Sequence, residues 1–175
     1  MKTKEKAQGR RESGAFIPIP TSVKHSENNK KLSKNGKAFL FDFIGQVRFK
    51  KGGTVNNGDL CAAPSIMQEY GWNSNESISY AVQELLHYEF IILTRRGDRR
   101  RPHLYGITWW AIDECGGKLD SGMVSNVPLN GWKKSKEKWK RPKREKKEEA
   151  KRTEKKSNSV PRFAKVKPLK TVDNL

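Results

Sequence analysis

Five arginines lie within seven positions of one short segment: Arg95, Arg96, Arg99, Arg100 and Arg101. Guanidinium groups form charge-assisted hydrogen bonds with phosphate oxygens, often two at a time. The segment lies between "EFIILTR" and "HLYGITWWAI", two apolar runs rich in the β-branched and aromatic residues typical of strands. The spacing therefore predicts a β-hairpin whose tip contacts a phosphate backbone or a minor groove.

The turn of this hairpin can be built in two ways. A two-residue turn at Gly97-Asp98 would set Arg95 opposite Arg100, and like charges facing each other across a hairpin are destabilising unless a polyanion relieves them. A longer loop that runs through Pro102 would leave the same cluster exposed. The embedded Arg-Gly-Asp triplet does not indicate cell adhesion, because the N-terminus lacks the apolar segment of a secretory signal.

Polar side chains also mark the exposed side of a predicted helix that ends near His87. Removing the inward positions of its apolar stripe leaves seven candidates for base or phosphate contacts: Ser74, Asn75, Glu76, Ser77, Ser79, Tyr80 and Gln83. Asn75 and Gln83 could pair with adenine, and the serines could bind phosphate or a base. Glu76 could accept from cytosine, but a capping role at the start of the helix explains it better.

The same helix carries no cation, since neither Lys nor Arg occurs between Trp72 and Phe90. Proteins that bind DNA gain much of their affinity by neutralising phosphates and releasing counter-ions. That affinity must therefore come from the arginine cluster and from the basic ends of the chain.

Residues with catalytic or metal-binding potential are scarce. The segment Asp113–Cys115 combines two carboxylates with a thiol, but no histidine lies nearby in sequence and no second acidic cluster accompanies it. Cys61 and Cys115 lie far apart without a Cys-x-x-Cys pair, so neither a disulfide framework nor a zinc site is indicated. The sequence predicts no catalytic residue, no metal and no cofactor, and hence a protein that is not an enzyme.

The formal charge of +18 is concentrated at the two ends of the chain. Counting Lys and Arg against Asp and Glu gives +5 for residues 1–31, +1 for 32–130 and +12 for 131–175. This balance favours a polyanionic partner, with nucleic acid ahead of an anionic membrane surface. No apolar run approaches the roughly 18 residues of a membrane-spanning helix. We therefore expect a cytoplasmic, nucleoid-associated bacterial protein with no membrane partner.

Both ends of the chain read as disordered. Residues 1–13 are charged and aperiodic, and residues 121–175 form a lysine-rich stretch without an apolar stripe to bury. Trp139 within that stretch could stack on a base. A purely solubilising role for the tail is the alternative.

The first helix is predicted within "LSKNGKAFLFDFIGQVRF", with Ser33 as its cap. Its apolar residues recur at i, i+3, i+4 and i+7 and predict one buried face, formed by Leu40, Phe43, Ile44 and Val47.

A helix-turn-helix follows. Pro64 suits the first turn of the next helix and Gly71 its left-handed end. The following helix is capped either by Asn73, in a capping box with Glu76, or directly by Ser74. Its inward positions are Ile78, Ala81, Val82 and Leu85.

Taken together, the order is helix, short strand, helix, turn, helix, hairpin. That order predicts an α+β fold, a winged helix-turn-helix domain of three helices plus a β-hairpin wing over residues 14–120, between disordered basic tails. Trp109 and Trp110 would lie on opposite faces of the return strand, one against the first helix and the other partly exposed.

Three stretches carry a resemblance to a known family: "FIPIPTSVKHS…LS…AFLFDFI", "GDL…APSIMQEYGW…ESISYAVQELLHYEFIILT" and "LYGITWWAIDECGGKLD". Over roughly residues 15–140 the chain resembles small phage- and prophage-associated helix-turn-helix proteins of proteobacteria. The resemblance implies DNA binding in the regulation or replication of a mobile element. The family tends to have Gly before "FI", where this chain has Glu89, so we expect a differently built exit from the preceding helix.

These patterns together predict a phage or mobile-element protein that binds double-stranded DNA. Its third helix would enter the major groove and its arginine-rich wing would contact the backbone, in transcription regulation or in replication, with a homodimer compatible with either role. The alternative is a phage interaction or adaptor protein whose basic tail binds RNA or an acidic protein partner.

Overall fold

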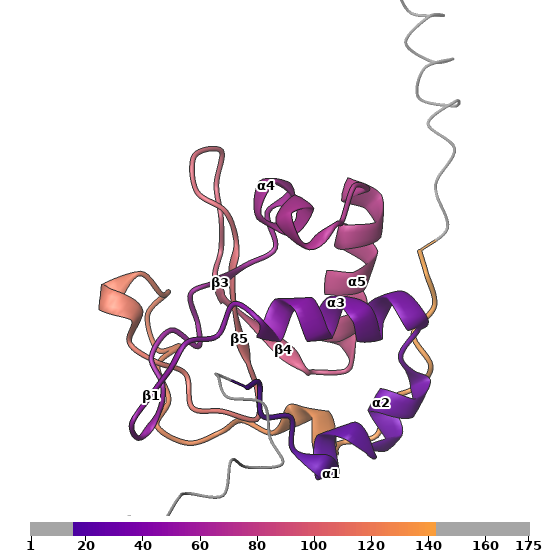
Figure 1. Cartoon of the computed structure of the whole chain (residues 1–175), viewed down its shortest axis with the longest axis horizontal. Helices are drawn as coiled ribbons and strands as arrows, with labels where there is room; N and C mark the ends of the chain where they lie inside the picture. The colour runs from indigo at the N-terminus through magenta and orange to yellow at the C-terminus, as the bar shows by residue number, and fades with distance from the viewer. Residues whose placement is uncertain (1–15, 143–175) are drawn as a thin grey trace, which may run out of the picture. The chain divides into compact units, whose positions relative to one another are not determined.

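The computed structural model describes residues 16–142, so the predicted arm 1–13 and the chain beyond Pro142 lie outside the described part. The described residues form five α-helices and two small sheets (Figure 1). The helices are α1 (Thr21–Lys24), α2 (Glu27–Lys31), α3 (Lys34–Ile44), α4 (Pro64–Met67) and α5 (Asn75–His87). Short 3-10 turns complete them: η1 (Gln68–Tyr70), η2 (Cys115–Gly117) and η3 (Gly131–Lys133). This mixture of helix and strand confirms the α+β class.

The two sheets are small and antiparallel. One pairs β1 (Phe49–Lys50) with β2 (Gly53–Thr54). The other contains β3 (Leu60–Cys61), β4 (Ile91–Arg95) and β5 (Leu104–Ile107), in the order β3-β5-β4. β5 is therefore the central strand, and its four residues are all buried.

Helix α3 follows the predicted pattern. Its cap is Ser33, whose hydroxyl accepts a hydrogen bond from the N–H of Gly36 at 2.9 Å. The predicted inward residues are buried, and Phe39 joins them at 0 % exposure. This face packs against α5, whose predicted inward residues are buried as well: Ile78, Ala81, Val82 and Leu85.

The cap of α5 decides between the two predicted alternatives. The hydroxyl of Ser74 accepts from the N–H of Ser77 at 3.2 Å, so Ser74 is the cap and the capping box with Asn73 is wrong. The preceding turn is as predicted, because Pro64 begins α4 and Gly71 ends η1 with a left-handed φ of 87°.

A buried carboxylate that the apolar pattern does not single out joins the two helices. Glu84 of α5 accepts from the backbone N–H of Ser33 at 2.7 Å and from its hydroxyl at 2.6 Å. The carboxylate therefore lies at the N-terminus of α3, where the helix dipole favours negative charge. Gly36 leaves the room for it, since a Cβ there would come within 2.5 Å of Glu84 Oε2.

The exit from α5 differs from the expectation. Glu89 adopts a φ of 56°, the left-handed conformation that usually belongs to glycine. The prediction of a differently built exit from this helix is therefore wrong. The turn keeps a residue with a positive φ, and that residue is Glu89 in place of glycine. The carboxylate of Glu89 pairs with Lys136.

The two adjacent tryptophans lie beyond the end of β5. Trp109 is buried edge-to-face against Phe90, and Trp110 is partly exposed against Phe49. The predicted division into one buried and one partly exposed ring is correct. Phe90, whose ring meets Trp109, belongs to the turn before β4, and the packing of a tryptophan against the first helix stays a prediction.

A fully buried asparagine ties the sheet to the chain that follows it. The side chain of Asn57 accepts from the N–H of Ile107 and donates to the carbonyls of Ile107 and Ala111, at 2.7 to 2.9 Å. Its backbone exchanges two hydrogen bonds with Asp113. Asn57 is thus a structural junction between the sheet and residues 107–113.

The chain beyond Asp120, which the sequence predicts to be disordered, packs onto the domain as far as Lys140. The backbone of residues 131–140, here called the strap, is bound by the side chain of Asn28. Trp132 of the strap is 5 % exposed and belongs to the core. The local sequence pattern did not predict this packing, because the hydrogen-bond partners of the strap lie 47 to 108 residues away in sequence. None of the helices in the described chain is long and apolar enough to cross a membrane.

Candidate nucleic-acid interface

The β4–β5 loop, residues 96–103, and the first turns of α5 project from the same end of the domain (Figure 1). α5 ends at His87 and β4 begins at Ile91, so helix and strand run in opposite directions. A helix of this length spans about 20 Å and the strand about 16 Å. The start of α5 and the end of β4 therefore reach comparable heights, with α4 between them in Figure 1.

The seven predicted polar residues lie where the sequence indicated, at the start and along one side of α5. Ser77 and Tyr80 are partly buried and the others are exposed: Ser74, Asn75, Glu76, Ser79 and Gln83. Tyr80 donates to Glu76 at 3.1 Å, and Gln83 donates to Ser79 at 3.0 Å. The surface is thus uncharged except for Glu76, and its role in base contacts stays a prediction.

The β4–β5 loop takes the longer of the two predicted geometries. β5 resumes at Leu104, which pairs with Arg95, so the arrangement with Arg95 opposite Arg100 is wrong. Asp98 closes the tip instead, with its N–H donating to the carbonyl of Arg101 at 2.8 Å. The longer loop separates like charges that the two-residue turn would oppose.

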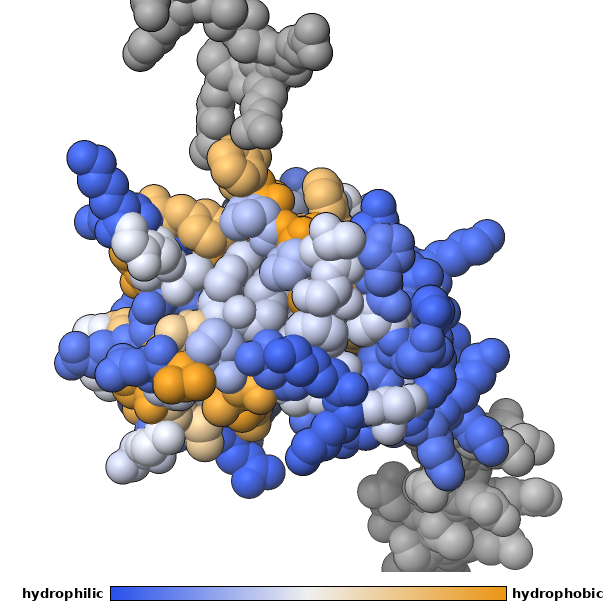
Figure 2. All heavy atoms as spheres, turned by 90° about the horizontal axis from the view of Figure 1, so that it is seen from below, coloured by the Kyte–Doolittle hydropathy of each residue, from blue (hydrophilic) through white to orange (hydrophobic). Residues whose placement is uncertain are grey.

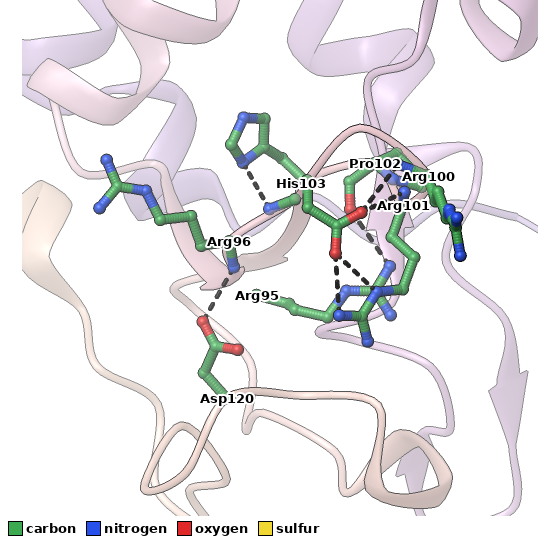
Figure 3. A network of polar contacts seen from close by, with 9 residues as sticks. Arg95, Arg96, Arg100, Arg101, Pro102, His103 and Asp120 are labelled. Atoms are coloured by element: carbon green, nitrogen blue, oxygen red, sulfur yellow. Dashed lines mark hydrogen bonds and ion pairs between the residues drawn. The ribbon is translucent and has the colours of Figure 1, made fainter.

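Asp98 also organises the loop through its side chain, whose bonds to Arg100 and Arg101 are among the dashed lines of Figure 3. Its carboxylate accepts from the backbone N–H groups of Arg100 at 2.8 Å and Arg101 at 2.9 Å. The guanidinium of Arg101 donates to it as well, at 2.9 and 3.1 Å. The bond from the Arg100 N–H, followed by the side-chain and backbone bonds of Arg101, holds the pKa of Asp98 below its ordinary value.

The five predicted arginines divide into two groups. Arg101 is paired with Asp98, and Arg95 donates to the carbonyl of Pro102 at 3.1 Å. The other three have no hydrogen-bond or ion-pair partner for their guanidinium groups within residues 16–142: Arg96, Arg99 and Arg100. Arg96 and Arg100 extend away from the loop on different sides in Figure 3. All three side chains are exposed, so their guanidinium groups lie at the surface.

Two contacts fix the base of the loop. The backbone N–H of Gly97 donates to Nδ1 of His103 at 2.9 Å, and that of Arg96 donates to the carboxylate of Asp120 at 2.8 Å. Gly97 admits no side chain, because a Cβ would come within 2.5 Å of the backbone nitrogen of His103. The sequence does not predict these two contacts, because nothing near Asp120 in the sequence marks it as a partner of Arg96. The role of Asp98 is easier to find, since an Asp that precedes two backbone N–H groups is a local turn signal.

The segment Asp113–Cys115 is built into the fold. Asp113 is bonded to Asn57, and burial followed by the nearby carboxylates of Asp59 and Asp113 raises the pKa of the Cys115 thiol to about 11. Nucleophilic cysteines need a lowered pKa, so this environment does not activate the thiol. Within residues 16–142 no three His, Cys, Asp or Glu side chains gather in a way that could hold a metal ion.

An apolar groove of about 910 Å³ lies between the extended N-terminal segment and the β1–β2 hairpin. Phe16, Pro18, Val47, Phe49 and Val55 are among its lining residues. The face opposite the β4–β5 loop shows several apolar patches between hydrophilic side chains (Figure 2).

Comparison of the chain with protein-family models, with curated proteins and with solved structures yields no match.

Proposed function

We propose that the protein is a winged-helix DNA-binding protein of a phage or other mobile element, acting in transcription regulation or replication. The arrangement of α3, α4 and α5 around the β3-β5-β4 sheet supports this assignment, because it has the element order of a winged helix. In that fold α5 is the helix that enters the major groove and the β4–β5 loop is the wing.

One observation carries the proposal. Three guanidinium groups without a partner in residues 16–142 lie on the β4–β5 loop, at the same end of the domain as a polar helix N-terminus whose one charged side chain is Glu76. Guanidinium groups supply the sequence-independent affinity for phosphate, and short polar side chains supply hydrogen bonds to base edges. The two features complement each other on a duplex, where phosphates flank the groove that a helix enters.

The division of the arginines sharpens the expected roles. Arg96, Arg99 and Arg100 contact the phosphate backbone, whereas Arg95 and Arg101 shape the loop. Replacing a contact residue removes affinity alone. Replacing Arg101 also removes the guanidinium that pairs with Asp98.

The test compares the double variant Arg99→Ala/Arg100→Ala with the control Lys50→Ala/Lys51→Ala, which removes the same charge from the exposed β1–β2 hairpin. Binding to a pool of random duplexes is measured against salt concentration. The wing variant should lower the slope of log affinity against log salt by about 1.8 and weaken binding on the order of tenfold. The control should change both quantities far less.

Equal effects of the two variants, or a wild-type protein whose affinity ignores salt, would overturn the proposal. Sequencing the bound duplexes then separates a regulator from a general binder. An enriched motif with two-fold symmetry indicates a sequence-specific homodimer.

A further inference from the structure

The strap runs along α5 from the end of that helix toward its beginning. Lys136 pairs with Glu89, just past the helix. The carbonyl of Glu137 then contacts the ring of His87 at 2.9 Å. The N–H of Trp139 donates to the Tyr88 hydroxyl at 2.9 Å, and its ring lies 6.3 Å from that of Tyr80. The direction of the strap therefore brings its last residues to the side of Tyr80, one of the predicted DNA contacts.

In Figure 1 the strap and the β4–β5 loop lie on the two sides of α5 and α4. The loop rises on the left, and the strap climbs on the right beside α2 and α5. A duplex groove that receives α5 has phosphates on both of its edges.

The side chains at the end of the strap alternate between facing the domain and facing solvent. Trp139 is half-buried and turned toward the domain, whereas its neighbours Lys138 and Lys140 are exposed. In an extended chain the residues on either side of an inward side chain point outward. Lys138 and Lys140 thus form a pair of outward cations beside the middle of α5.

We propose that the strap is a second phosphate-binding element, in which Lys138 and Lys140 contact the DNA backbone on the side of α5 away from the β4–β5 loop. This proposal rests on the proposed function and extends it. The duplex is held at both edges of the groove, by the loop arginines on one side and by the strap lysines on the other.

The strap is held in place by residues that do not touch DNA. Asn28 donates to the carbonyls of Trp132 and Lys134 at 2.9 and 2.8 Å and accepts from the N–H of Lys136 at 2.9 Å. Lys31 adds bonds to Ser135 at 2.9 Å and to the Lys136 carbonyl at 2.7 Å. A cation fixed beside its phosphate loses less conformational freedom on binding than one on a free tail. Asn28 is therefore a positioning residue for DNA binding.

The first experiment compares Lys138→Ala/Lys140→Ala with the same Lys50→Ala/Lys51→Ala control, in the full chain. Both pairs are exposed, so each variant retains the fold and loses the same charge. The strap variant should lower the salt slope by about 1.8 and weaken binding on the order of tenfold, as the wing variant does. Equal behaviour of strap variant and control overturns the proposal.

The wing variant distinguishes a failure of the strap proposal from a failure of the proposed DNA-binding function. If Arg99→Ala/Arg100→Ala weakens DNA binding and the strap variant matches its control, the strap proposal is wrong and the proposed function stands. If neither differs from the control, the proposed function itself is wrong.

The second experiment tests positioning through Asn28→Ala, with folding checked by urea denaturation. The lysine substitutions are repeated in that background, which gives a double-mutant cycle. If Asn28 positions the strap, Lys138→Ala/Lys140→Ala weakens binding several-fold less there than in the native background. Additive effects in a folded Asn28→Ala protein overturn the positioning role.

Discussion

Asp98 is the only acidic residue between Arg95 and Arg101, and it gives the loop its shape. Its carboxylate accepts from two backbone N–H groups and from one guanidinium. A negative charge among five arginines lowers the net attraction for a polyanion slightly. It also fixes where the three unpaired guanidinium groups point, which a flexible arginine-rich loop would not do.

Acid should open this loop. The pKa of Asp98 lies below its ordinary value of 3.8, so the ordered loop is stabilised above that pH and loses the stabilisation as the pH falls through the lowered pKa. The amide resonances of Arg100 and Arg101 should therefore stay constant from pH 7 to about 4 and shift only at lower pH. In Asp98→Asn, which keeps an acceptor but cannot titrate, the two resonances should no longer follow the pH. Resonances that already shift near pH 5 would contradict this account.

Cys115 should be a slow thiol. Its pKa of about 11 leaves roughly one thiolate in a thousand at pH 8, against about one in four for an ordinary cysteine. Alkylation by iodoacetamide, followed by mass spectrometry, should be on the order of a hundredfold slower in the native protein than in urea. The native rate should rise about tenfold for each pH unit up to pH 10. A rate that is already high and flat at pH 8 would show an activated thiol instead.

At the scale of elements, α5 was predictable because its apolar residues repeat with the helical period and its ends carry Ser74 and a turn. The same periodicity predicted α3 and its buried face. Glu84 could not be found in this way, because its burial depends on the N-terminus of another helix 51 residues away in sequence. From the sequence alone, a carboxylate such as that of Glu84 is predicted to be exposed, because its hydrogen-bond partners are not visible in the local pattern.

The candidate site likewise has one part that the sequence predicts and one part that only the fold shows. The exposed arginines and the polar side of α5 follow from residue type and helical period alone. The pairing of Arg101 with Asp98 and the anchor at Asp120 required the folded loop. The strap escaped prediction because lysine-rich sequence without an apolar stripe is typical of disorder, and its partners, Asn28 and Tyr88, are single residues without a local pattern.

The left-handed residue after α5 gives a direct stability test. Glu89→Gly relieves a positive φ that costs about 1 kcal/mol for a residue with a Cβ, whereas Glu89→Ala keeps that cost. Both variants lose the ion pair with Lys136, which is partly exposed and worth little. Urea denaturation should therefore find the Gly variant more stable than the Ala variant by about 1 kcal/mol. Equal stabilities would mean that the positive φ is not strained here.

At the scale of the whole molecule, the nearly neutral middle of the chain carries the core, and the folded unit continues into the basic end as far as Lys140. The strap closes the domain: Trp132 is buried, and Asn28 lies under it at 1 % exposure. The unit therefore ends about 20 residues later than the sequence indicates, because a single tryptophan and a buried amide replace an apolar stripe.

Truncation should locate this boundary. A chain that ends at Asn130 loses the burial of Trp132 and leaves the side chain of Asn28 without its partners. Compared with a chain that ends at Pro142, its free energy of unfolding should fall by about 4 kcal/mol, measured by urea denaturation. The α-helical circular dichroism of the longer chain serves as the reference for a folded domain. Equal stability of the two chains would show that the strap adds nothing to the fold.

The bond between Asn28 and Trp132 spans 104 residues of sequence, and this span bears on how the protein is made. During synthesis the helices and the sheet have all left the ribosome before the strap appears, yet the amide of Asn28 and the wall of the core around Trp132 stay open until it does. Contacts between such distant residues form late, because a long loop must close first. The nascent chain therefore passes through an incomplete state that exposes apolar surface, and that stage is when it is most prone to aggregate and most dependent on chaperones.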